Sequence, residues 1–178
     1  MKLCDRIIHS ITWRICRMEA GIAAYRVIRR LVSLAFPFQP EKSPLSDLAL
    51  RPRYRVEVRR STVEGAGDGL FALEDVPGGE ILGEYGGDRV TSLVRLLRLR
   101  NKDYTMMTDN PSLVIDAAAR PEALMRYVNH HFDAGCRNLE RAVEGEVVHY
   151  VTTRPVRKGE EFFVDYGELY WKLRGLRR

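Results

Sequence analysis

Residues 126–131 (RYVNHH) and residues 160–167 (EEFFVDYG) are the two stretches that decide how this chain folds. In the first, the polar pair Asn129-His130 follows an apolar step, where the pattern predicts buried or half-buried positions. In the second, a short apolar strand ends in Asp-Tyr-Gly. Buried polar side chains need hydrogen-bonding partners, and the partners of this pair are either other protein groups or a ligand.

The length and composition of the chain allow one sizeable hydrophobic core. It has 178 residues, of which 45% are hydrophobic, and its formal net charge is +5. The charge is uneven, because residues 1–53 hold ten Lys and Arg against four Asp and Glu, whereas residues 54–178 hold nineteen against twenty. The basic character belongs to the N-terminal segment, and we expect no direct nucleic-acid site in the later part.

The three cysteines, Cys4, Cys16 and Cys136, lie far apart and form no CxxC pair. This spacing is typical of neither a disulfide scaffold nor a zinc site, and the polar residues of 130–136 match no zinc pattern either. We therefore expect no metal and a reducing location, in the nucleus or the cytoplasm. No run approaches the roughly 18 apolar residues of a membrane span.

Residues 1–36 are expected to be helical, because apolar residues recur at steps of three and four from Ile8 to Val32. Three interpretations stay open: a helix packed on the domain, a basic amphipathic targeting or membrane-surface segment, and a helix that contacts a partner or nucleic acid. Residues 37–53 contain four prolines and are expected to form a linker, since proline disfavours a helical residue before it.

From Tyr54 the apolar period changes to two, and short apolar runs separated by glycine turns continue to residue 167. One turn, within residues 64–72 (EGAGDGLFA), has glycines at alternate positions, which let backbone approach backbone or ligand closely. It is not the dinucleotide fingerprint, because Leu70 occupies the place of the last glycine. We predict a mostly β (α+β) domain over residues 54–167, with a short aromatic and basic tail over residues 168–178.

Five motifs in a fixed order give this domain a resemblance to a known family. They are GAGDGLFA at 65–72, GEY at 83–85, IDA at 115–117, RYVNH at 126–130 and GEEFFVDYG at 159–167. Together they resemble the SET domain of protein-lysine methyltransferases. The resemblance implies small β-sheets wrapped around a pseudoknot, in which the segment carrying the last tyrosine threads beneath a loop near the Asn-His pair.

The resemblance also implies a reaction. S-adenosyl-L-methionine would lie on one face of the domain, and the substrate lysine would enter from the other face through a narrow channel. The methyl group would pass to the lysine amine by in-line attack, so geometry and desolvation carry much of the rate. Because free lysine has a pKa of about 10.4, a dry aromatic channel that favours the neutral amine suits this chemistry.

By the same resemblance, the catalytic roles are assigned to Tyr166, whose hydroxyl orients the amine, and to Tyr104, as a second channel tyrosine. The expected cofactor-binding residues are Gly67, Asp68, Gly69, Arg126, Asn129, His130 and Trp171. Trp171 would belong to an aromatic lid over residues 169–171. The alternatives are packing roles: Tyr166 and Trp171 in the core, Tyr104 outside the channel, and the Asn-His pair as a capped turn.

Three positions depart from the family pattern. His131 stands where a small residue is usual, and a longer loop precedes Asn138. Val164 stands where many members carry a Phe or Tyr that limits the number of methyl groups added, so mono-, di- and trimethylation all stay open. The cysteine clusters that flank many members are absent on both sides.

The predicted function is that of an S-adenosyl-L-methionine-dependent protein-lysine N-methyltransferase. Its expected partner is a protein substrate, a histone tail or another chromatin protein first and a non-histone protein second. One alternative is a catalytically silent SET domain that binds peptides or chromatin, although the intact Tyr166, Asn129 and His130 argue against it. Another treats residues 1–36 as a membrane or organelle anchor that carries the domain as cargo.

Overall fold

The computed structural model describes residues 44–91 and 102–174, together with residues 24, 27 and 31. The helix expected over residues 1–36 lies outside the described residues, apart from those three helical positions. Within the expected linker, helix α3 (Asp47–Leu50) places its buried Ala49 against Gly86, where an added Cβ would lie 2.6 Å from that of Ala49. The domain boundaries stay a prediction.

The glycine-rich turn connects two paired strands. Strands β1 (Val56–Arg60) and β2 (Asp68–Ala72) are antiparallel, and the Ser61 N–H donates to the Gly67 carbonyl at 2.9 Å, which closes the turn. Gly65 and Gly67 have φ values of +77° and +83°, in the left-handed region that other residues rarely adopt. The turn therefore requires glycine at these two positions.

Two three-stranded antiparallel sheets form most of the remaining domain. In spatial order their strands are β4 (Asp88–Val90), β6 (Val114–Asp116) and β5 (Thr105–Met107) in one sheet, and β3 (Ile81–Glu84), β9 (Val147–Thr152) and β8 (Leu139–Glu144) in the other. The central β9 alternates half-buried and buried residues, as expected of a strand with one face on the core.

The two stretches that decide the fold meet in a small parallel sheet. Strand β7 (Asn129–His130) pairs with β10 (Phe163–Val164). On its other side β10 is held by the buried Asn138, whose Oδ1 accepts from the Phe163 N–H at 2.8 Å and whose N–H donates to the Phe163 carbonyl at 3.1 Å. The loop that leaves β7 thus returns on the far side of β10, and β10 passes between the two, as the predicted pseudoknot requires.

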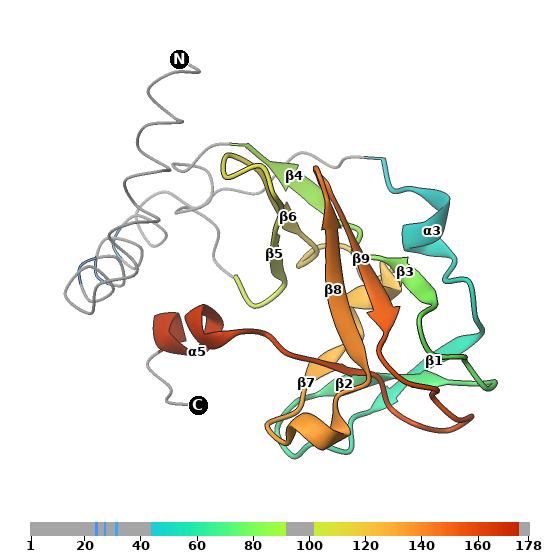
Figure 1. Cartoon of the computed structure of the whole chain (residues 1–178). Helices are drawn as coiled ribbons and strands as arrows, with labels where there is room; N and C mark the ends of the chain where they lie inside the picture. Colours follow the sequence, from blue (N-terminus) through green and yellow to red (C-terminus); the bar gives the residue numbers. More distant parts are fainter. Residues whose placement is uncertain (1–23, 25–26, 28–30, 32–43, 92–101, 175–178) are drawn as a thin grey trace.

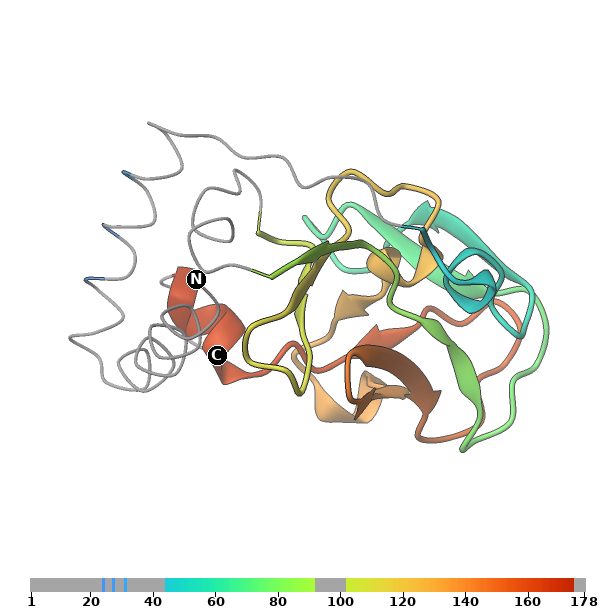
Figure 2. The same cartoon turned by 90° about the horizontal axis from the view of Figure 1, so that it is seen from above.

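Short helices flank these strands. The 3-10 helix η1 (Leu124–Tyr127) leads into β7, η2 (Ala134–Cys136) lies in the loop after it, and α5 (Glu168–Arg174) follows β10. Figure 1 and Figure 2 both place α5 and α3 at opposite ends of the domain. Within the described ranges, no helix is long and apolar enough to cross a membrane.

One hydrophobic core joins the sheets. Its largest fully buried side chains include Tyr150, Phe71, Phe162, Leu70, Leu82 and Met125. Beside this core, Arg120 Nε donates to Asp88 Oδ1 at 2.8 Å in a buried ion pair. Asp116 lies opposite Asp88 in the register of β4 and β6, and burial raises its pKa. Small, mostly antiparallel sheets with few helices confirm the predicted fold class.

Candidate functional site

Two cavities meet at Tyr166. The larger, of about 580 Å³, lies against the glycine-rich turn and β7, and we call it the glycine-loop cavity. The smaller, of about 300 Å³, lies among aromatic side chains, and we call it the aromatic channel. The residues that line both are Asp103, Arg126, Tyr166 and Tyr170. A group held in one cavity therefore lies beside a group held in the other.

The glycine-rich turn forms one wall of the larger cavity. Gly67 and Asp68 line this cavity, and a Cβ added at Gly67 would meet nothing within 4 Å. Gly69 is different, because its missing Cβ makes room for a protein group: a Cβ there would lie 2.1 Å from Glu161 Oε1. Gly67 and Asp68 thus line the cavity, whereas Gly69 lies against a carboxylate, and the binding of a cofactor by these three residues stays a prediction.

The Asn-His pair forms the wall next to this turn. Asn129 Nδ2 donates to the Asp68 carbonyl at 2.9 Å, which ties β7 to the glycine-rich turn. The buried His130 accepts at Nδ1 from the Tyr166 N–H, 3.2 Å away, and its ring packs edge-on against Trp171, with centroids 4.9 Å apart. The pair therefore has protein partners and still lines the cavity, so the capped-turn alternative does not describe it fully.

Arg126 lies at the junction of the two cavities. Its guanidinium packs over the Tyr104 ring, 4.1 Å from the centroid, and over the Tyr127 ring at 5.2 Å. Its buried Nε has no hydrogen-bond partner among the described residues, and neither does the buried Nε1 of Trp171. These are two N–H donors in the wall of the glycine-loop cavity that a ligand could satisfy.

Tyr104 lies in a different place from the one that the sequence predicted. It lines the glycine-loop cavity beside Arg126, and it is absent from the lining of the aromatic channel. Its backbone carbonyl contacts a residue of the channel, because it accepts a hydrogen bond from the Tyr85 hydroxyl at 2.8 Å. The Tyr104 ring thus belongs to the glycine-loop cavity, as in the alternative that places it outside the channel.

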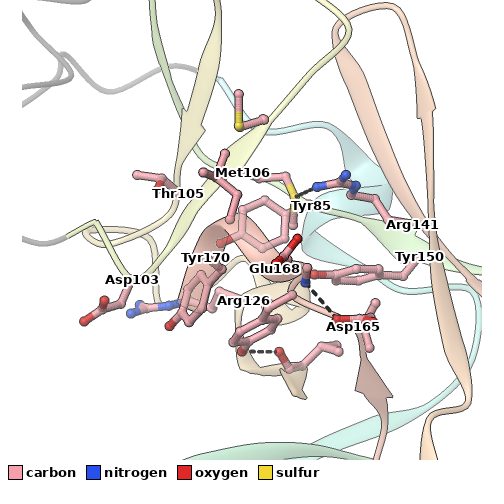
Figure 3. Close-up of a pocket in the computed structure, with 16 residues that line it drawn as sticks. Tyr85, Asp103, Thr105, Met106, Arg126, Arg141, Tyr150, Asp165, Glu168 and Tyr170 are labelled. Carbon is pink, nitrogen blue, oxygen red and sulfur yellow. Dashed lines mark hydrogen bonds between the residues drawn. The ribbon is translucent and has the colours of Figure 1, made fainter. Parts of the chain in front are cut away.

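The aromatic channel has tyrosines in its walls (Figure 3). The Tyr166 hydroxyl donates to the Val128 carbonyl at 2.9 Å, which fixes its direction. Tyr85 and Tyr150 are buried, and burial raises the pKa of both phenols, so both stay neutral at physiological pH. Arg141 stands at the rim, where it donates to the Met106 sulfur at 3.6 Å (Figure 3).

Helix α5 contributes to both cavities. Leu169 and Tyr170 line the aromatic channel, and Trp171 lines the glycine-loop cavity. The rings of Tyr166 and Tyr170 lie 4.6 Å apart, and those of Tyr170 and Trp171 5.0 Å apart. The predicted aromatic lid is compatible with these positions, and its function stays a prediction.

The loop after β7 holds two of the three positions that depart from the family pattern. The His131 ring packs on Phe163, with centroids 5.0 Å apart, and Arg137 donates to the His131 carbonyl at 2.8 Å and to Asp165 Oδ2 at 2.6 Å. The longer loop is thereby fastened next to Tyr166. In the part of the chain that the structure describes, no group of three or more His, Cys, Asp or Glu is arranged to hold a metal ion.

The sequence reasoning missed Tyr85, Tyr150 and Glu161. Each tyrosine belongs to an apolar strand pattern and looks like an ordinary core residue. Glu161 is only 6% exposed, although it stands beside Glu160 in the sequence. Strand alternation places the two carboxylates on opposite sides but does not indicate which of them is buried.

Comparisons with known proteins agree with this geometry. The family model described as SET domain matches residues 67–167. The histone-lysine N-methyltransferase ASHH2 of Arabidopsis thaliana is 32% identical over 136 residues, which cover 69% of this chain and 8% of that protein. The N-lysine methyltransferase KMT5A-A of Danio rerio is 28% identical over 116 residues, which cover 60% of this chain and 34% of the relative. This chain thus spans a minor part of both relatives.

Solved structures are also similar to this chain. The Chaetomium thermophilum polycomb repressive complex 2, in an autoinhibited conformation bound to S-adenosylmethionine, matches with a TM-score of 0.53 and 27% identity. The match covers 68% of this chain and 17% of that chain. A humanized mutant of the Chaetomium complex, bound to the inhibitor GSK126, matches with the same TM-score and 26% identity over 65% of this chain and 15% of its own.

Proposed function

This chain belongs to the SET-domain family, and on that premise we propose that it is an S-adenosyl-L-methionine-dependent protein-lysine N-methyltransferase. The observation that carries the proposal is the meeting of the two cavities at Tyr166. One cavity lies against the glycine-rich turn and the Asn-His pair, and the other against the buried tyrosines Tyr85 and Tyr150. A methyl donor and an amine acceptor need two such adjacent sites. The glycine-loop cavity would hold the cofactor and the aromatic channel the lysine side chain.

The residues of the glycine-loop cavity fit this cofactor. Its volume of about 580 Å³ lies within the range of ligand sites of about 300–1,000 Å³. The unpartnered donors Arg126 Nε and Trp171 Nε1 suit the acceptor atoms of a polar nucleoside with an amino-acid tail. Gly67, Asp68, Asn129 and His130 complete the walls, and we assign the cofactor contacts to these residues with Arg126 and Trp171.

When bound, S-adenosyl-L-methionine supplies a methyl group on a positively charged sulfur. The chain supplies what the amine needs. Tyr85, Tyr150 and Val164 supply a buried part of the channel wall, where both phenols stay neutral. The carboxylates of Asp103, Asp165 and Glu168 also line the channel and favour the ammonium form. An ammonium that packs against the buried rings, away from these carboxylates, loses its proton more readily than the free side chain, whose pKa is about 10.4.

Tyr166 orients the acceptor amine in this proposal. Since its hydroxyl hydrogen is directed to the Val128 carbonyl, the oxygen keeps lone pairs that can accept an N–H of the lysine amine. That hydrogen bond would aim the nitrogen lone pair toward the glycine-loop cavity. The positioning of reactants in this way accounts for much of the acceleration of two-substrate reactions.

We propose a protein substrate, with histones and other chromatin proteins first, because the similar proteins include histone-lysine methyltransferases. The same similarity favours a nuclear site of action over a cytoplasmic one. A non-histone protein is the second candidate, since another similar protein is an N-lysine methyltransferase without a histone in its description.

The test uses the purified chain with methyl-labelled S-adenosyl-L-methionine, mixed histones and a cell lysate, and lysine methylation is read by mass spectrometry. The matched control is Tyr166→Phe, which keeps the ring and removes the hydroxyl. The expected result is label on lysine with the wild-type chain and far less with the control. Cofactor binding by the wild-type chain without any transfer would contradict the enzyme and favour a silent peptide-binding module. Equal label in both would contradict the role of the Tyr166 hydroxyl.

A further inference from the structure

One buried carboxylate stands behind the glycine-loop cavity and is not part of its polar wall. Glu161 is 6% exposed and lies in the segment between residue 159 and β10, where it forms an isolated bridge with Phe71 of β2. This places its side chain beneath the glycine-rich turn. A buried charge is costly unless hydrogen bonds surround it, so its partners indicate what it stabilises.

Four donors converge on this carboxylate. Ser61 Oγ donates to Oε1 at 2.6 Å, and both the N–H and the hydroxyl of Thr62 donate to Oε2 at 2.7 Å. Asn129 Nδ2 donates to Oε1 at 3.3 Å. The first three fasten the start of the glycine-rich turn, and the fourth reaches across to β7. The carboxylate thus links the two walls of the cavity that adjoin here, the glycine-rich turn and β7.

The bond to Asn129 also determines which way its carboxamide faces. Its Nδ2 donates to both Glu161 and the Asp68 carbonyl, so both amide hydrogens have protein acceptors. Among the described residues, Asn129 Oδ1 has no hydrogen-bond partner, and the side chain lines the cavity. Gly69 makes this arrangement possible, because any Cβ there would displace Glu161 Oε1.

We propose that Glu161 is a positioning residue of the cofactor site, which acts through Asn129 and the glycine-rich turn without touching the cofactor. The inference rests on the proposed function, since it assumes that this cavity holds the methyl donor. It predicts that loss of the Glu161 charge loosens cofactor binding more than it slows the transfer step.

The informative variant is Glu161→Gln, which keeps the shape and replaces one oxygen by an NH₂ group. In one orientation this NH₂ meets Asn129 Nδ2, and in the other it meets the Thr62 N–H, so one donor faces another donor either way. The matched control is Glu160→Gln, which removes the neighbouring carboxylate that accepts from the Arg157 N–H and pairs with Arg154, away from both cavities.

The measurement is calorimetric affinity of the whole chain for S-adenosylhomocysteine, together with KM for S-adenosyl-L-methionine, kcat and the melting temperature. We expect Glu161→Gln to weaken affinity and raise KM by about tenfold or more, as loss of a hydrogen bond to a charged group does, with kcat within about threefold. Glu160→Gln should change neither affinity nor KM.

A double-mutant cycle tests whether Glu161 acts on the cofactor site through Asn129. In an Asn129→Ala background, Glu161→Gln should add less than about threefold, because residues that act through one another are not additive. Full additivity, or a folded Glu161→Gln with wild-type affinity, would overturn the inference. If Glu161→Gln does not fold, Ser61→Ala decides: about threefold weaker affinity supports the inference and unchanged affinity overturns it. A wild-type chain that binds no cofactor would instead overturn the proposed function, and the inference with it.

Discussion

The glycine-loop cavity and the aromatic channel share Tyr166 but are built differently. The walls of the first come from contiguous stretches, the glycine-rich turn and the Asn-His pair, whose polar groups bond to one another across the cavity. The second combines residues 105–107 and 164–170 with single residues of the core, Tyr85 after β3 and Tyr150 in β9. If the proposed function holds, cofactor binding depends on two local motifs, whereas the surroundings of the amine come from several distant elements of the chain.

The two cavities should therefore respond differently to substitution. Changes in the glycine-loop cavity should weaken cofactor binding, and changes in the aromatic channel should alter transfer or its products while cofactor binding persists. The variants that follow either separate these two effects or show that they cannot be separated.

The largest expected effect is that of Tyr166→Phe. Removal of one pre-oriented hydrogen-bonding group from an active site typically lowers kcat by about 10²–10³-fold, and we expect a loss of this size in methyl transfer. Affinity for S-adenosylhomocysteine should stay within about threefold, because the ring that packs on Tyr170 is kept.

A control for Tyr166→Phe is Tyr54→Phe, which removes a hydroxyl from a residue that packs on the core and lines neither cavity. It should leave transfer unchanged. If Tyr166→Phe lost cofactor affinity in proportion to its loss of transfer, the separation between the two cavities would be wrong.

Asn129→Ala should give the opposite pattern. It removes the hydrogen bonds to the Asp68 carbonyl and to Glu161, and it leaves that carboxylate one donor short. We expect the affinity for S-adenosylhomocysteine, measured by calorimetry, to fall by about 10- to 100-fold.

The matched variant is Asn110→Ala, whose side chain bonds to Glu146 and to the Ser112 N–H, outside both cavities. Its affinity should equal that of the wild-type chain. Equal weakening in the two asparagine variants would indicate a general loss of stability and would remove Asn129 from the cofactor site.

Gly67→Ala should have a smaller effect, and Gly145→Ala is its internal standard. Both glycines have positive φ, +83° and +61°, and a Cβ at either would meet nothing within 4 Å, so the cost is one of backbone conformation, about 1–2 kcal/mol. Both variants should lose this stability in chemical denaturation. Gly67→Ala alone should also bind S-adenosylhomocysteine about three- to tenfold more weakly, because the same backbone strain at Gly67 displaces the glycine-rich turn, which is a wall of the cavity.

The smallest expected effect concerns the products. Val164 is buried and lines the aromatic channel, where Val164→Phe would fill space that added methyl groups need. The ratio of di- and trimethylated to monomethylated lysine, read by mass spectrometry, should fall, while the first transfer slows by less than about tenfold. An unchanged or higher ratio would show that other residues limit the size of the channel.

The contrast between the cavities also explains how much of the site could be predicted from the sequence. Asn129 and His130 stood out in the sequence because polar groups in apolar surroundings need partners, but their roles and that of Tyr166 followed from the family resemblance and stay predictions. Tyr85 and Tyr150 could not be distinguished from core residues, because period-two alternation has the same form whether a strand faces a packed core or a channel.

Two further differences have physical causes. Tyr104 was expected in the channel, but Arg126 packs over its ring and holds it in the glycine-loop cavity, a contact that no local pattern encodes. Gly69 was expected to contact the cofactor, which stays a prediction, and the threading of the last strand adds a separate reason for glycine there, because it brings Glu161 beneath this residue. The order of the sheets and the threading followed only from the family resemblance, since parallel pairing of two-residue strands leaves no periodic signal.

A cofactor cavity beside a lysine channel is tested most directly by the structure of the whole chain with S-adenosylhomocysteine and a peptide that it methylates. The predicted result is the nucleoside in the glycine-loop cavity against Gly67 and Asn129, and the lysine side chain in the aromatic channel with its amine within hydrogen-bonding distance of the Tyr166 hydroxyl. A nucleoside outside the glycine-loop cavity, or a lysine that enters without passing Tyr85 and Tyr166, would contradict it.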